Sequence, residues 1–549
     1  MNKTNIKNKD VSRNICKNSN TYISLLTQSN KKTNHNSTVY HNYKAYVKKN
    51  TSLFIKSQQK LLSNLFHIKD NTTFTITYTE EALDNSINKS INKSINNSIY
   101  AIPQFIDLFR YLITINEFIN KFTLKEQKIL KDNLSINKTK EQCYIFLIKS
   151  PLGKKIISVY NSLGDSIIFN NDVFKDKFPT LKFHHLLINS FTSYKILEDL
   201  ELNIKKVVKY SIQWKGKTLT DCLYLFMYEE KSTEKITPEY LIQIGTEIIK
   251  RILFFNTFLE TDTYPDKFIV FLTNNKKEID KELEEEAHFK TINVNTAVTN
   301  TKDIIIYREQ ELLKSIFHEL IHFHQLDFRH ISDTILNKII NYLITTHNIN
   351  SNNEYLLYEC ITETLSNILN NIYYSVNIKE FHTHLQDEIL FSTLQMCKIM
   401  HICKYKKWSE FSLSHSNSNM TIEVKPDILY KSKTKSRQFK QESCVFSYYI
   451  LKLYILLQLD TYFKTVLDSK MKFIQTENSF NKLIEIFDAS RKNSILESII
   501  NHILKGLNSK HIYKTKKTKK TKKTKQKNKI NKTLRMTCLE SNLFSENAI

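Results

Sequence analysis

Glycine and proline are scarce in this chain of 549 residues, which contains 5 glycines and 6 prolines. These residues usually mark turns and domain boundaries, so composition and periodicity must indicate the boundaries here. Asn, Lys, Ile, Tyr and Phe are used heavily instead, as expected for an AT-rich genome, cellular or viral. Abundant lysine and asparagine are therefore weak evidence of a function.

Long apolar runs are also missing. The nearest candidate, YYILKLYILLQL from Tyr448 to Leu459, is too short for a membrane span and contains Lys452, so we predict a core helix there. The N-terminal MNKTNIKNKDVSRN has no apolar stretch typical of a secretory signal. The 8 cysteines form no CxxC pair. Together these absences favour a reduced intracellular protein, cytoplasmic or nuclear, without membrane contact.

Positive charge is concentrated near the end of the chain. The formal net charge is +25, and residues 510–535 hold 12 lysines, one arginine and no acid, which leaves about +12 for the remainder. Such a block repels itself, so we expect residues 509–549 to form a disordered basic tail. It could make weak, non-specific contacts with nucleic acid through counterion release, or it could merely aid solubility.

The length allows two to four domains. Residues 1–100 are rich in Asn, Ser, Thr and Lys and include the near-repeat SINKSINKSINNSI, so we predict a largely disordered region. Thr72–Thr79 alternates like a strand. We assign residues 101–235 to an accessory α+β domain, with a helix from Pro103 and strands joined by turns at Gly153 and Gly164.

Residues 236–508 have a pattern typical of a catalytic α+β domain. Apolar periodicity predicts a long helix from Pro238, several short strands, two further long helices and a mostly helical remainder. The expected strands are 266–273, 290–299 and 303–308; residues 276–287 form a polar helix or loop; and the two helices are 309–328 and 353–374.

The first of these two helices carries the sequence His-Glu-Leu-Ile-His. Residues i and i+4 share one helix face, so His318 and His322 present two imidazoles that can occupy adjacent corners of a zinc tetrahedron. Glu319 projects about 100° around the helix axis from His318, close enough to reach a water molecule bound to the zinc. A structural alternative is a helix with histidines at its polar edge. Leu313, an apolar residue of the opposite face, favours a packed active-site helix.

Catalytic zinc usually has three protein ligands, so a third is needed. The pattern with Gly at 325 and His at 328 is absent, since this chain has Gln325 and Phe328. Glu359 and Glu363 lie 37 and 41 residues after His322 and share one helix face. One of them could bind the metal while the other supports a ligand imidazole. The apolar residues around them disfavour simple solvent exposure.

With HELIH and the downstream E-x-x-x-E, the chain resembles the gluzincins, zinc metallopeptidases related to thermolysin and to neurotoxin light chains. The resemblance covers about residues 240–375 and implies Glu359 as the ligand, Glu363 as its support and Zn²⁺ as the cofactor. It also implies a mixed sheet whose edge strand pairs with extended peptide substrate. The spacing between the histidines and Glu359 departs from thermolysin, which leaves the subfamily open.

Several further residues are candidates for the same site. A transition-state oxyanion needs a hydrogen-bond donor, for which Tyr448 is our choice over Tyr449, Tyr355 and Tyr358. The strand expected over residues 290–299 is the candidate edge strand. Three of its residues are assigned to substrate binding: Asn293, Asn295 and Ala297. His324 and His330 are expected at the surface or in supporting positions.

The sequence thus predicts an α+β protein with a zincin-like catalytic domain that hydrolyses a peptide or protein substrate. Glu319 would serve as the general base, and His318, His322 and Glu359 would hold zinc. Two alternatives stay open: a non-catalytic polyanion-binding or scaffolding protein, and a zincin-fold pseudoenzyme that binds metal and cleaves nothing.

Overall fold

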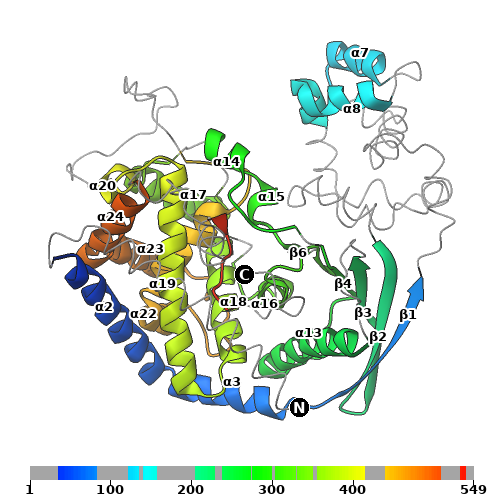
Figure 1. Ribbon diagram of the computed structural model, residues 1–549, viewed down its shortest axis with the longest axis horizontal. Helices are drawn as coiled ribbons and strands as arrows, with labels where there is room; N and C mark the ends of the chain where they lie inside the picture. The colour runs from blue at the N-terminus through cyan, green and yellow to red at the C-terminus, as the bar shows by residue number, and fades with distance from the viewer. Residues whose placement is uncertain are drawn as a thin grey trace, which may run out of the picture.

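The computed structural model describes eleven stretches of the chain: residues 35–82, 122–134, 140–156, 204–228, 238–273, 275–299, 303–328, 331–349, 355–413, 439–508 and 532–539. The fold is mixed and mostly helical, with a small sheet, as expected for the α+β class (Figure 1). The helix predicted from Pro103, the near-repeat and His330 lie outside the described residues.

A six-stranded mixed sheet forms one side of the molecule, in the order β1-β2-β3-β4-β7-β6. The first three strands are antiparallel, β3, β4 and β7 are parallel, and β6 returns antiparallel to β7 at the edge. The bounds are β1 Thr75–Ala82, β2 Ile204–Trp214, β3 Lys217–Tyr228, β4 Lys267–Phe271, β6 Ala297–Thr299 and β7 Asp303–Ile306; β5 (His288–Phe289) and β8 (Lys440–Gln441) form a separate pair.

Two helices lie against this sheet (Figure 1). In α13 (Pro238–Leu259), Gly245 leaves room for the ring of Tyr210 on β2, because a Cβ there would come within 2.3 Å of that ring. The Tyr210 hydroxyl donates to the Leu241 carbonyl at 2.6 Å. Helix α16 (Leu312–Phe323) is buried over its first eleven residues and packs against α13 through an edge-to-face contact between Phe317 and Phe254. The motif helix is thus held from behind by the sheet and α13.

The remainder is helical, and one apolar core extends from the sheet through these helices. The predicted core helix from Tyr448 is confirmed as the buried π-helical segment η2 (Phe446–Leu451) followed by α21 (Lys452–Leu456). The other helices are α14 Lys281–Glu286, α15 Thr291–Val294, α17 Asp333–Thr346, α18 Tyr358–Tyr374, α19 Ile378–Ile402, α20 Trp408–Phe411, α22 Leu459–Thr465, α23 Glu477–Arg491 and α24 Ser494–Asn508.

The expected disorder of residues 1–100 is wrong for residues 35–82. They form α2 (His35–Ser57), α3 (Gln59–Asn71) and β1, and α2 and α3 run along the outside of the helical part (Figure 1). Tyr43, Val47 and Phe54 follow helical spacing and are fully buried. The polar average composition of the region conceals this apolar face, which gains enough burial to order the helix.

The proposed domain boundary at residue 235 does not separate two sheets. Strand β3, which precedes it in the sequence, pairs directly with β4, which follows it. The strands expected around Gly153 are also wrong. Residues 151–156 are helical, and α8 (Lys140–Lys149) precedes them and packs with α7 (Leu124–Asn133). A short apolar run such as YIFLI suits a buried strand or a helix equally well, so periodicity could not decide between them.

The strand expected over residues 290–299 is correct only for β6. Residues 291–294 turn as the short helix α15, because the Asn293 side chain accepts a hydrogen bond from the Lys290 amide at 2.9 Å. The tail prediction also needs correction. Residues 532–539 lie inside the helical part, and Leu534, Thr537 and Cys538 are fully buried. Within the described part of the chain, no helix has the length and apolar character to cross a membrane.

Candidate metal centre

Helix α16 presents the two motif histidines on one face, as its sequence predicts. The rings of His318 and His322 are 4.8 Å apart and nearly perpendicular, with their Nε2 atoms 3.2 Å from each other. Both side chains are largely buried. Leu320 and Ile321, on other faces of the helix, are fully buried and fix its rotation. The local sequence therefore aims two imidazole nitrogens at one point.

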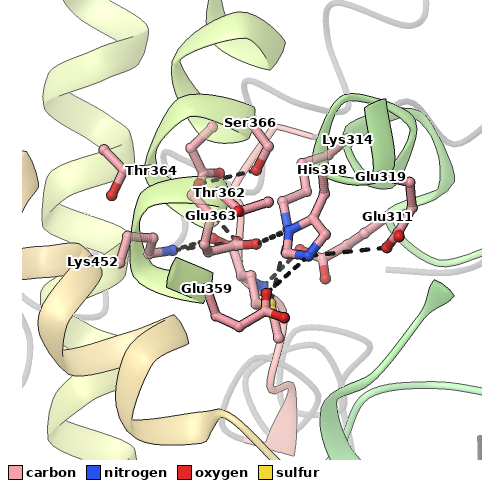
Figure 2. Close-up of polar contacts among 12 residues, drawn as sticks. Glu311, Lys314, His318, Glu319, Glu359, Thr362, Glu363, Thr364, Ser366 and Lys452 are labelled. Atoms are coloured by element: carbon pink, nitrogen blue, oxygen red, sulfur yellow. Dashed lines mark hydrogen bonds and ion pairs between the residues drawn. The ribbon is translucent and has the colours of Figure 1, made fainter. Parts of the chain in front are cut away.

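Helix α18 lies against α16 and brings Glu359 to this point (Figure 2). One carboxylate oxygen, Oε2, lies 3.2 Å from Nε2 of His318 and 3.3 Å from Nε2 of His322. In a zinc tetrahedron with bonds of about 2.0–2.1 Å, two ligand atoms are about 3.3–3.4 Å apart. The three atoms thus have the chemistry and nearly the spacing of three corners of such a tetrahedron, and the cluster could hold a metal ion.

Each imidazole is supported from behind by a carboxylate. Nδ1 of His318 lies 3.0 Å from Oε2 of Glu363, and Nδ1 of His322 lies 2.6 Å from Oδ2 of Asp327. A proton on Nδ1 that is shared with a carboxylate leaves the Nε2 lone pair available to a metal. Two such lone pairs 3.2 Å apart would repel each other unless a proton or a metal ion lies between them. The arrangement therefore suits a metal ion.

Sequence reasoning predicted Glu363 as a support but missed Asp327. The expected helix extended to Phe328, whereas α16 ends at Phe323 and the chain reverses at Gln325, which has a φ of 53°. The amides of Gln325 and Leu326 donate back to the carbonyls of His322 and Ile321, the pattern of a Schellman turn. This turn returns Asp327 to His322. The sequence feature that could have indicated Asp327 is the presence of an acidic residue shortly after the end of the motif helix.

Charge around the cluster shifts its pKa values strongly. Burial lowers the pKa of His322, but Glu359 and Asp327 outweigh burial and raise that pKa to about 10. Burial alone would raise the pKa of Glu359, yet the two imidazoles hold that pKa well below its usual range. The metal-free site therefore favours a protonated His322 beside an ionised Glu359. A metal ion would have to displace that proton.

Glu363 is itself held by buried cations. It is fully buried, contacts Lys314 of α16 directly, and lies 3.9 Å from Lys452 of α21 (Figure 2). Burial raises the pKa of this carboxyl, but Lys314, His318 and Lys452 together lower it to about 2. Glu363 is thus an ionised acceptor for His318 throughout the physiological range. Lys314 and Lys452 are further members of the site that sequence reasoning missed.

Glu319 lies at the side of the cluster that faces the sheet edge. Its Oε1 is 4.0 Å from Nε2 of His318, and its Oε2 accepts a 2.5 Å hydrogen bond from the hydroxyl of Thr299 on β6. The same hydroxyl lies 3.3 Å from the Glu319 carbonyl. The expected base thus lies beside the cluster, and an unforeseen threonine of the edge strand holds its carboxylate.

The tyrosine candidates separate clearly in the structure. Tyr448 lies with its ring 6.1 Å from that of His318, and burial, followed by Glu359, raises its pKa well above the ordinary value. Tyr449 donates instead to the Leu534 carbonyl, away from the cluster. Tyr355 packs on Phe446. Tyr358 places its ring 5.8 Å from that of His322.

Two of the three expected substrate residues do not lie on the edge strand, which corrects their assignment. Asn293 and Asn295 are buried outside any strand, where Asn293 caps a turn and Asn295 accepts a hydrogen bond from Ser443 at 2.5 Å. Ala297 does lie on the edge strand β6 and is partly exposed. His324 is partly buried against α13: its Nε2 lies 3.1 Å from Oδ1 of Asn256, and burial lowers its pKa to about 4.

Comparison with known proteins adds no relative, because no family model, curated protein or solved structure matches this chain. A function can therefore be inferred only from the residues of the chain and their geometry.

Proposed function

We propose that this chain is a zinc-dependent peptidase with a zincin-like catalytic region formed by β4, β6, β7, α16 and α18. The main support is the position of Glu319 beside a buried cluster of two imidazoles and one carboxylate, with each imidazole supported by an acid. A purely structural cluster has no need of a second, separately held carboxylate at its side.

His318, His322 and Glu359 would hold the ion, which would supply Lewis-acid polarisation of a peptide carbonyl and acidify a water molecule. Glu319 would take the proton from that water as its oxygen adds to the carbonyl carbon. The same carboxyl would then deliver the proton to the amide nitrogen as the carbon–nitrogen bond breaks. Thr299 keeps the Glu319 carboxylate turned toward the cluster.

Two further features suit a peptide substrate. Strand β6 is the edge strand nearest α16, and among the described residues only one of its sides pairs within the sheet, so an extended peptide could add there through main-chain hydrogen bonds. Tyr448 lies on the η2 side of the cluster, where its hydroxyl could donate to the oxyanion that forms during attack. Burial favours the neutral, donating form of this hydroxyl.

The decisive variant is Glu319→Gln, which preserves size but removes the proton acceptor. It should keep about one zinc per chain and lose hydrolysis of a peptide library by about 10²–10⁴-fold. The matched control is Glu497→Gln, the same substitution on the distant helix α24, which should change neither the zinc content nor the rate of hydrolysis.

Zinc content separates the parts of this proposal. The double variant His318→Ala, His322→Ala should purify without zinc, and stoichiometric zinc in it would contradict the site. If the unaltered chain binds zinc but cleaves no peptide in the library, the chain is a metal-binding pseudoenzyme and the proposed peptidase activity is wrong. Wild-type hydrolysis by Glu319→Gln would show that the base is elsewhere.

A further inference from the structure

Residues 532–539, here called the inserted segment, are bound by the rest of the chain through their main-chain groups. The carbonyls of Lys532, Thr533 and Met536 accept hydrogen bonds from the Ile279 amide, Lys398 and Lys452 at 2.7, 3.0 and 2.6 Å. Tyr449, Gln395 and Asn370 donate to the carbonyls of Leu534, Arg535 and Leu539. The pattern is that of a peptide held in a groove, in which main-chain hydrogen bonds provide affinity.

The amides of the inserted segment bind two buried acids. One oxygen of Glu311 accepts from the amides of Met536 and Thr537 at 2.6 and 2.7 Å. One oxygen of Glu388 accepts from the Thr537 hydroxyl and the Cys538 amide at 2.8 and 2.9 Å. Both acids are almost fully buried, so the loss of these donors would leave their charges poorly compensated.

These contacts continue to the metal centre in two steps. Lys452, which donates to the Met536 carbonyl, lies 3.9 Å from Glu363 and 4.0 Å from Glu388. Lys314 contacts Glu363 and has the Met536 sulfur 3.9 Å away. Glu363 in turn supports His318. The inserted segment therefore fixes the two lysines that hold the carboxylate behind a motif histidine (Figure 2).

Backbone geometry agrees with this role. Glu311, immediately before α16, has a φ of 63°, a left-handed conformation that is strained for a non-glycine residue. Its carboxylate is thereby placed between Lys277, at 2.7 Å, and the two amides of the inserted segment. Such strain persists where the surroundings over-determine the conformation, and here the inserted segment supplies two of the contacts.

We propose that the inserted segment is an intramolecular peptide ligand on which the metal affinity of the site depends. It acts by positioning Glu363 and His318 through Lys314 and Lys452, and it contributes no atom to the metal itself. The proposal rests on the metal centre of the proposed function. It also gives a role to residues 532–539, which were expected to be part of a disordered basic tail.

Two truncations test this dependence. A chain that ends at residue 539 keeps the inserted segment and should bind zinc as the full chain does. A chain that ends at residue 531 should bind zinc about 10–100-fold more weakly, the loss typical when support of a ligand is disturbed. Cobalt in place of zinc should give an altered visible spectrum in the shorter chain. A synthetic peptide of residues 532–539 should restore affinity and spectrum, whereas a scrambled peptide should not.

A second variant covers the case in which the shorter chain does not fold. A site for a specific protease is inserted after residue 520 of the full chain, which is folded, loaded with zinc and then cut. The fragment that contains the inserted segment should stay bound during gel filtration, and excess free peptide of residues 532–539 should exchange with it.

The outcomes are distinguishable. Equal zinc affinity and spectrum in the chains that end at 531 and 539 would overturn the inference, as would release of the cut fragment without loss of zinc. Absence of zinc from the full chain would instead contradict the proposed function.

Discussion

The carboxylate behind His322 gives the sharpest test of how the metal centre is built. Asp327 is 1% exposed, and its Oδ2 lies 2.6 Å from Nδ1 of His322. Loss of such a supporting acid typically weakens metal affinity by about 10–100-fold, or about 1.4–2.7 kcal/mol. Asp327→Asn keeps the size and one acceptor oxygen but loses the charge. We therefore expect a loss near tenfold for Asp327→Asn and near a hundredfold for Asp327→Ala.

The pH dependence of the same variant has a definite sign. In the metal-free chain the pKa of His322 is raised to about 10, so at neutral pH zinc must displace a proton and the apparent affinity should increase as the pH rises toward 10. Removing the Asp327 charge lowers that pKa, so fewer protons are released on binding. The difference in apparent zinc affinity between the unaltered chain and Asp327→Asn should therefore become larger as the pH rises.

The assay is competition for zinc with a chromophoric chelator over a range of pH, with calorimetry in two buffers to count released protons. Asp488→Asn is the matched control, since Asp488 pairs with Arg491 on α23 at 2.7 Å, away from the metal centre. Affinity of Asp327→Asn within twofold of the unaltered chain at every pH would refute the supporting role. An equal loss in Asp488→Asn would show a general effect on stability.

Three further predictions concern single side chains. Tyr448→Phe should reduce kcat by about 10²–10³-fold with zinc content unchanged, and an unchanged kcat would exclude its hydroxyl as oxyanion donor. Thr299→Val should reduce kcat by about 10–150-fold with little change in KM, because a hydrogen bond to a charged group contributes about 1.5–3 kcal/mol. Thr299→Ser should restore kcat, and failure to do so would point to packing instead. Burial, followed by the charge of Arg491, lowers the pKa of His347 to about 3 in the folded chain, against about 6.5 in the unfolded chain. The neutral imidazole therefore contributes its full stabilisation above pH 6.5, and this stabilisation is lost as the pH falls from there toward 3. Lowering the pH from 7 to 5 should therefore reduce the free energy of unfolding by about 2 kcal/mol. Denaturant titration should find that this pH dependence is absent in His347→Gln.

Local periodicity in the sequence determined the helices of the candidate site. The spacing of His318 and His322 places them on one face of any helix, and the apolar residues between and around them require burial. The same reasoning applied to Glu359 and Glu363, which share a face of α18 one turn apart. Their convergence on the two imidazoles agrees with the expected order of the two acids.

Contacts that helical periodicity does not determine became visible only in the structure. Asp327 reaches His322 because a left-handed residue ends α16 early, and helical periodicity cannot predict where such a turn occurs. Thr299 holds Glu319 only because the edge strand β6 lies against α16.

The inserted segment shows the limit of composition most clearly. Residues 510–535 have the composition of a uniform basic block, yet the residues at its end and just beyond it, Lys532–Leu539, are held by groups as distant in the sequence as Ile279, Glu388 and Tyr449. An average over a charged block does not reveal the few apolar residues in it or just beyond it, Leu534 and Met536 among them, that are buried against the rest of the chain. The sequence by itself determined which helix carries the two histidines of the candidate metal site. The tertiary structure decided which charges and main-chain groups hold that site in place, because those contacts depend on the packing of distant parts of the chain.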